Sequence, residues 1–200
     1  MLNSSDILQT ISMYFPKGLC YDDPEYKLST EFLNNIRKRE EIKLNTLYAT
    51  NLYLYIKRIF EKFEVVNWTD MESFNCYEYR VLLHPNQSIL DDDTELMKVL
   101  GGKRMDLFLF VSVLGKYYYL FVNETIYNQV SSEWTFKKIF DYPEKLKGEI
   151  EELQEFFNRE GYYEISNHIA HEVVDDVETE LIEKGKVKIF NCLFTDIILI

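Results

Sequence analysis

The sequence predicts an α+β fold in a single domain: a mainly antiparallel β-sheet with N-terminal helices and a C-terminal helical pair packed on it. Two observations predict this fold. Apolar residues recur every three or four positions up to about residue 64, and strand-like apolar patterns dominate from there to about residue 140. Expected helices, strands and helices also follow one another in separate runs, which is typical of α+β proteins. The 200 residues include no proline-rich or serine-rich linker, so we expect one domain.

The N-terminal part, residues 1–64, is expected to form three helices. Residues 4–6 offer N-cap side chains for the first helix. Pro24 suits the first turn of the second, and Asn45 or Thr46 can begin the third. The apolar residues at helical spacing are Ile7, Leu8, Ile11, Phe15, Leu28, Phe32, Leu33, Ile36, Leu47, Leu52, Ile56, Ile59, Phe60 and Phe63.

Residues 65–140 are expected to form the sheet. Residues 77–83 alternate between large apolar and charged side chains, which predicts a half-buried strand. Residues 105–113 and 117–122 predict a hairpin whose first strand is central and covered on both faces. A further strand is expected at residues 133–140.

Three consecutive aspartates, residues 91–93, precede an expected short helix that ends at Gly101 and Gly102. They lack the alternating spacing and central glycine of a calcium-binding loop. Carboxylates just ahead of a helix interact favourably with its N-terminal dipole, and this accounts for their position.

The remaining chain is expected to form an acidic helical part, residues 141–185, and a final strand, residues 186–200. One helix should run from Pro143 to Gly161 and a second from about residue 167 to 184, ended by Gly185. The last four residues are all aliphatic, so we expect the final strand to be inserted in the sheet. The alternative is a homodimer in which this strand pairs across the interface.

The net charge of −12 is concentrated in one part of the sequence. Fourteen of the thirty-four acidic residues lie between Asp141 and Glu183, with only three basic residues among them. Such a segment repels nucleic acid and anionic membranes and attracts basic proteins. The fifteen tyrosines add side chains that are common at protein interfaces. The residues expected to bind a partner are Tyr162, Tyr163, Glu164, Glu172, Asp175, Asp176 and Glu178.

The pattern of histidines and cysteines predicts neither a metal site nor a cofactor. The three cysteines form no CxxC pair, and the sequence from His168 to Glu172 differs from the HExxH motif of zinc enzymes. On the expected helix, His168, Glu172 and Asp175 lie opposite the apolar side. There is neither a secretory signal nor an apolar run of about 18 residues, so we expect a cytoplasmic protein without a membrane partner.

These observations predict a non-enzymatic acidic module that binds a basic protein. Its expected form is an immunity or antitoxin-like bacterial protein that masks a basic toxin such as a nuclease, an analogy based on physical type. One alternative is a hydrolase or nuclease. Another is a phage-type or structural assembly protein built through the C-terminal strand. The residues that could assemble the site of the enzyme alternative are His84, His168, His171, Asp106 and Cys76.

Overall fold

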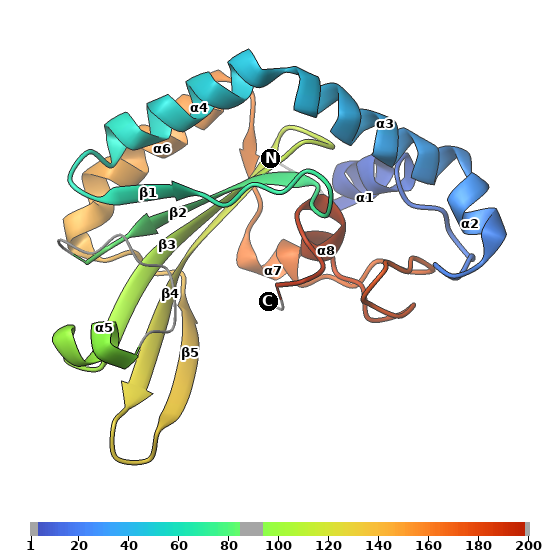
Figure 1. Cartoon of the computed structure of the whole chain (residues 1–200). Helices are drawn as coiled ribbons and strands as arrows, with labels where there is room; N and C mark the ends of the chain where they lie inside the picture. The colour runs from blue at the N-terminus through green and yellow to red at the C-terminus, as the bar shows by residue number, and fades with distance from the viewer. Residues whose placement is uncertain (1–3, 85–93, 199–200) are drawn as a thin grey trace.

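The computed structural model describes residues 4–84 and 94–198 and contains one six-stranded sheet (Figure 1). Its first five strands pair in chain order, each antiparallel to the next, and β6 pairs parallel with the start of β4. The predicted α+β fold in one domain is therefore confirmed. The strands are β1 (Glu64–Asn67), β2 (Cys76–Leu82), β3 (Lys103–Ser112), β4 (Tyr117–Asn128), β5 (Glu133–Ile139) and β6 (Tyr163–Glu164).

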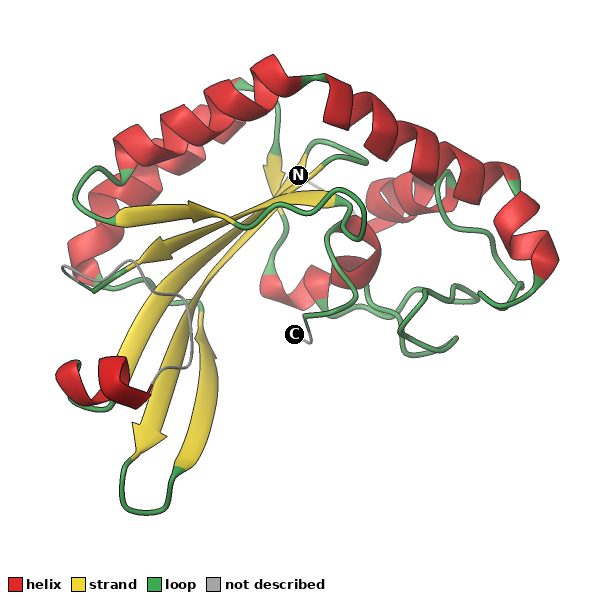
Figure 2. Ribbon diagram, viewed as in Figure 1, coloured by secondary structure: helices red, strands yellow, loops and turns green. Residues whose placement is uncertain are grey.

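One face of the sheet is covered by α4 (Thr46–Ile59) and α6 (Lys147–Arg159), as Figure 2 shows. The ring of Tyr53 on α4 stacks on Tyr79 of β2 at 6.0 Å between centroids. Phe157 on α6 stacks on Tyr118 of β4 at 4.5 Å. Burial of such large rings is the main stabilising contribution to this layer.

The other face is covered at one end by α8 (Ile189–Leu193), which lies near α1 (Ser4–Ser12) and α7 (Asn167–Ala170). The ring of Phe190 packs against Phe110 of β3 and Tyr119 of β4, each at 5.3 Å between centroids. Strands β3 and β4 are thus covered on both faces, which confirms the predicted central hairpin.

Residues 4–6, expected to cap the first helix, already lie within α1, whereas the next two expected helices begin where the sequence predicts. Pro24 opens α2 (Pro24–Leu28), and the Asn45 side chain accepts a hydrogen bond from the amide of Tyr48 at the start of α4. The expected second helix is divided at Ser29, whose hydroxyl accepts a hydrogen bond from the amide of Phe32 and so caps α3 (Thr30–Leu44). Between β2 and β3, α5 (Thr94–Val99) forms as expected, whereas aspartates 91–93 lie outside the described residues.

The expected helix from residue 167 to 184 is wrong beyond Ala170. From residue 171 to 188 the chain is irregular, with one isolated bridge between Val173 and Lys188. Its backbone groups bond across the segment itself, as Val174 does to Val187, and to a distant part of the chain, as Asp176 does to Gly18. Because valine, threonine and aspartate have modest helix propensity, these contacts outweigh the helical pattern.

The expected final strand at residues 186–200 is also wrong, because Ile189–Leu193 is the helix α8 and residues 194–198 are irregular. Residues 187–194 are almost entirely apolar and buried, and such a short run fits a buried strand and a buried helix equally well. Residues 199–200 lie outside the described part of the chain. A short 3₁₀ helix, η1 (Glu144–Leu146), precedes α6, which ends near Gly161 as predicted.

Across residues 4–84 and 94–198, the structure contains no helix with the length and apolar character needed to cross a membrane.

Candidate functional site

The three partner-binding residues predicted around β6 have different surroundings. Tyr162 is buried, and its hydroxyl shares a 2.7 Å hydrogen bond with that of Tyr48. Glu164 accepts hydrogen bonds from Gln154, at 2.8 Å, and from the hydroxyl of Tyr118. Tyr163 is the exposed member of the three. Tyr162 and Glu164 therefore stabilise the interior rather than offer a binding surface.

The other four predicted residues lie on the irregular segment after α7. Glu172 accepts a hydrogen bond from Ser4 at 3.0 Å, while Asp175 and Asp176 are exposed. Glu178 is half-buried and accepts a hydrogen bond from the backbone amide of Tyr21 at 3.1 Å. This contact joins the predicted segment to a loop near the N-terminus.

The acidic stretch of the sequence does not form one surface. The acidic residues of α6 lie beside α4, where Glu152 pairs with Arg58 at 3.3 Å and Glu149 with Lys62 at 3.4 Å. The segment from Asp175 to Glu183 is on the opposite side of the view in Figure 1, beneath α2. The charge of the sequence is therefore divided between two separate regions.

Around α2, two distant segments combine into what we call the acidic rim. Residues 20–25 and 175–183 are joined by hydrogen bonds from the Tyr21 hydroxyl to Glu180, at 3.0 Å, and from the Tyr21 backbone amide to Glu178, at 3.1 Å. These two segments contain eight acidic and no basic residues. The rim consists of Asp22, Asp23, Glu25, Asp175, Asp176, Glu178, Glu180 and Glu183.

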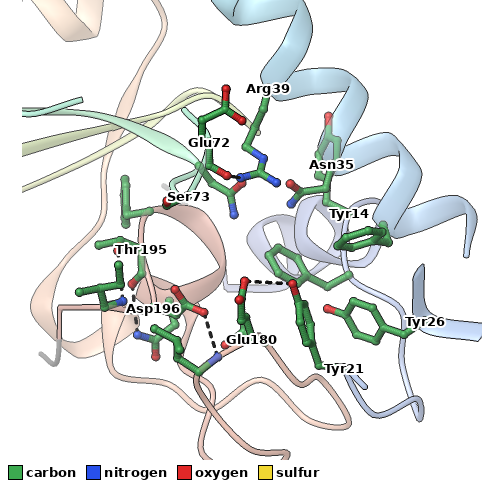
Figure 3. A pocket seen from close by; sticks show the side chains of 18 residues that line it. Tyr14, Tyr21, Tyr26, Asn35, Arg39, Glu72, Ser73, Glu180, Thr195 and Asp196 are labelled. Atoms are coloured by element: carbon green, nitrogen blue, oxygen red, sulfur yellow. Dashed lines mark hydrogen bonds between the residues drawn. The ribbon is translucent and has the colours of Figure 1, made fainter. Parts of the chain in front are cut away.

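A cavity of about 330 Å³ lies beside the acidic rim (Figure 3). It is enclosed by the loop that follows α1, by α2 and α3, by the loop before β2, by residues 179–181 and by the chain around α8. Aromatic side chains and polar groups contribute together to its lining. The lining residues are Tyr14, Phe15, Tyr21, Tyr26, Phe32, Asn35, Arg39, Glu72, Ser73, Asn75, Thr179, Glu180, Leu181, Asn191, Phe194, Thr195, Asp196 and Ile197.

Helix α3 brings Asn35 and Arg39, which are four residues apart, to the same side of the cavity. Asn35 is only 5% exposed, and its amide makes no hydrogen bond within the described parts of the chain. The Nη1 group of Arg39 donates to the backbone carbonyl of Glu72, while its buried Nε has no partner among the described residues. Polar groups with unused hydrogen-bonding capacity therefore line this side of the cavity.

Carboxylates line the other side of the cavity. Glu180 accepts the hydrogen bond of the Tyr21 hydroxyl, and Asp196 accepts one from the backbone amide of Leu181 at 3.4 Å. Burial, with the neighbouring Glu180, raises the pKa of Tyr21 to about 12. The charge of Asp196 also raises this pKa, whereas the charge of Arg39 lowers it. The tyrosine hydroxyl thus lies in the electric field of both sides of the cavity.

Sequence reasoning missed most of this site. Asp22, Asp23 and Glu25 form a short acidic run between Tyr21 and Tyr26. That combination was the signal in the sequence that could have indicated this part of the site. Asn35, Arg39 and the carboxylates opposite them are more than 130 positions apart in the chain, so no local pattern connects them.

Of the five residues of the enzyme alternative, the structure brings together His84 and Asp106. The His84 Nε2 atom is 4.0 Å from Asp106, which accepts a 2.8 Å bond from Arg104. His84 is 7% exposed, and burial together with the Arg104 charge lowers its pKa, which favours the neutral imidazole. Cys76 is at the other end of β2, where burial raises its thiol pKa well above the ordinary value.

The remaining two histidines, His168 and His171, lie on or beside α7. His168 is exposed and lies 3.4 Å from Glu172, and His171 bonds to the carbonyl of Asn167. The described ranges contain no group of three or more histidine, cysteine, aspartate or glutamate side chains arranged to hold a metal ion.

Comparisons of the chain with protein-family models, with curated proteins and with solved structures found no match. The function proposed below therefore depends on the geometry and charge of the chain itself.

Proposed function

We propose that this protein is a non-enzymatic module that binds a basic protein partner through the acidic rim. Its expected biological form is a cytoplasmic immunity or antitoxin-like protein that masks a basic toxin such as a nuclease. The observation that carries the proposal is the convergence of eight acidic residues from two segments that are far apart in the sequence and contain no basic residue themselves. A field of one sign attracts an oppositely charged protein and repels nucleic acid and anionic lipid.

Exposed apolar side chains next to the rim support a protein partner rather than a free ion. Leu181 and Ile197 line the mouth of the cavity and are 61% and 54% exposed. Tight protein interfaces combine a small apolar centre with a polar surround that excludes water. In this proposal the rim accelerates association, and the apolar side chains with Tyr21 slow dissociation.

The two alternatives receive less support. His84 and Asp106 are farther apart than a hydrogen bond requires, and the other three residues of the enzyme alternative lie elsewhere. The assembly alternative depended on a C-terminal strand, whereas residues 189–198 contain a helix and irregular chain.

The proposal is tested by affinity capture from source-cell extract at low salt, followed by elution with a salt step and mass spectrometry. The wild-type chain should retain a stoichiometric basic protein, since the attraction is screened as salt rises. A triple rim variant, in which Asp22→Asn, Glu25→Gln and Asp175→Asn are combined, should lose it.

A matched control changes the same number of exposed acidic residues on α6 and at its C-cap, away from the rim. This control combines Glu151→Gln, Glu155→Gln and Glu160→Gln, and it should retain the partner. An empty eluate from the folded wild-type chain would contradict the proposal, as would equal retention by the rim variant and the wild type.

A further inference from the structure

The charges around the cavity are divided between its two sides (Figure 3). Arg39 provides a guanidinium on the α3 side, while Glu180 and Asp196 provide carboxylates on the other. The carboxylate of Glu72 pairs with Lys43. A ligand of one sign would be attracted to one side of the cavity and repelled by the other. A ligand that carries both signs would be stabilised at both of its ends.

The α3 side of the cavity has hydrogen-bonding groups that the described chain leaves unused. The Asn35 side chain is only 5% exposed, makes no hydrogen bond within the described residues, and is aimed into the cavity, where its amide can bond to a ligand. The neighbouring guanidinium of Arg39 presents a planar set of donors. Planar guanidinium and amide donors suit a carboxylate, which can accept two parallel hydrogen bonds.

The aromatic walls suit the other end of such a ligand. The rings of Tyr21 and Tyr26 are 5.1 Å apart between centroids, and those of Tyr26 and Phe32 are 5.4 Å apart. The ammonium of Lys27 already lies over the ring of Tyr21, which shows that this cluster attracts a cation. A second ammonium inside the cavity would meet the same rings, together with Glu180 and Asp196.

We propose that the cavity binds a small zwitterion of the α-amino-acid type. Arg39 and Asn35 hold its carboxylate, and Glu180 and Asp196 hold its ammonium between the tyrosine rings. The cavity volume of about 330 Å³ lies at the lower end of the range of about 300–1,000 Å³ in which small-molecule ligands are bound. This inference does not depend on the binding of a protein partner at the rim.

The test is calorimetric titration of the full chain with the free proteinogenic amino acids, followed by the N-acetylated and the amidated form of the best binder. At least one free amino acid should bind with a Kd below about 10 mM, and each blocked form should bind at least about tenfold more weakly. The inference is overturned if no free amino acid binds in this range, or if either blocked form binds as tightly as the free one.

Two variants separate recognition of the ends from a general effect on folding. Arg39→Gln should remove the preference for the free acid over the amide, but keep the preference for the free amine. Asp196→Asn should remove the preference for the free amine over the N-acetylated form, but keep the preference for the free acid. If these residues only stabilised the fold, each variant would weaken the binding of the free, N-acetylated and amidated forms alike. That result would overturn the assignment of Arg39 to the carboxylate and Asp196 to the ammonium. Arg58→Gln makes the same chemical change at an exposed position on α4 and should leave every affinity unchanged.

The triple rim variant distinguishes this inference from the proposed function. Asp22, Glu25 and Asp175 do not line the cavity, so their substitution should abolish capture of the basic protein and preserve amino-acid binding. If the wild type captures a basic protein but binds none of the amino acids, the inference falls and the proposed function stands. If it binds an amino acid but captures no protein, the proposed function falls alone.

Discussion

Glu78 shows how a single buried charge is accommodated in the sheet. Its side chain is 0% exposed, and its Oε1 atom accepts a 2.7 Å bond from Nε of Arg80. The Arg80 guanidinium lies over the rings of Trp68 and Phe108, at 4.8 Å and 4.5 Å from their centroids. Burial raises the pKa of Glu78 above the ordinary 4.5, although Arg80 opposes this effect.

The raised pKa of Glu78 predicts a pH-dependent difference between the wild type and Glu78→Gln. Since the folded state holds the proton more tightly than the unfolded state, ionisation of Glu78 reduces stability as pH rises through the folded-state pKa. The variant lacks this loss, so its unfolding free energy relative to wild type should increase with pH. Urea denaturation at a series of pH values measures the difference, and a constant difference would contradict the prediction.

At Tyr21, the predicted change is in the tyrosine pKa itself. Burial raises this pKa, and the hydrogen bond and charge of Glu180 raise it further, to about 12. The substitution Glu180→Gln should therefore lower it, whereas Glu183→Gln, at an exposed rim position, should leave it unchanged. NMR titration of the labelled Tyr21 ring provides the measurement. Equal pKa values in all three proteins would show that Glu180 does not control this hydroxyl.

At the scale of an element, Gly102 connects α5 to β3. Its φ is +84°, and an added Cβ would lie 3.0 Å from the carbonyl oxygen of Tyr127. Its amide donates to Met97 and its carbonyl accepts from Tyr127, which fixes the helix end to β4. Only glycine adopts this conformation at low cost.

A pair of glycine substitutions tests this connection. Gly102→Ala should destabilise the protein by about 1–3 kcal/mol, because alanine is strained at positive φ and crowds Tyr127. Gly148→Ala, in the first turn of α6 with open space around it, should instead stabilise by up to about 1 kcal/mol. Chemical denaturation compares the two, and effects of the same sign would refute the prediction.

At the scale of the whole molecule, the net charge of −12 is distributed over two acidic regions. The α6 region is partly compensated by Arg58 on α4 and by Lys62, which follows that helix. The acidic rim has no basic residue within its two segments. Lys186 pairs with Glu183 at 2.7 Å and Lys27 lies near Asp22 and Glu180, so the rim is also partly compensated, while its other carboxylates repel one another.

Added salt should consequently raise the stability of the protein. An increase in ionic strength from about 0.01 M to about 0.1 M shortens the screening length from about 30 Å to about 10 Å. Thermal unfolding should shift to higher temperature over this range, and the shift should be smaller in the triple rim variant. A lower melting temperature at higher salt would show that attractive ion pairs dominate instead.

The sequence predicted correctly those features that depend on residues close together in the chain. Pro24 and Asn45 mark helix starts through their own backbone and side-chain chemistry, and both predictions are confirmed. The hairpin of β3 and β4 has neighbouring strands, so its apolar pattern was sufficient. Long-range contacts explain the failures: Val174 bonds to Val187 instead of continuing a helix, and Tyr162 and Glu164 are used inside the fold.

The candidate site was the least predictable part for the same reason. Asn35 and Asp196 face one cavity although 161 positions separate them in the sequence. Periodicity and capping signals reach only a few residues along the chain, so a site of this kind becomes visible only in three dimensions.

The pairing of β1 to β5 in chain order has a consequence for the time course of folding. Each of these strands needs only its neighbour in the sequence, so the sheet can form through short loop closures. The cavity and the rim require residues 14–39 to meet residues 175–197, a much longer closure. A partly folded chain can therefore contain the sheet before either site exists. A ligand of the cavity would bind only the finished structure, so its binding would shift the equilibrium from the partly folded chain to the complete fold.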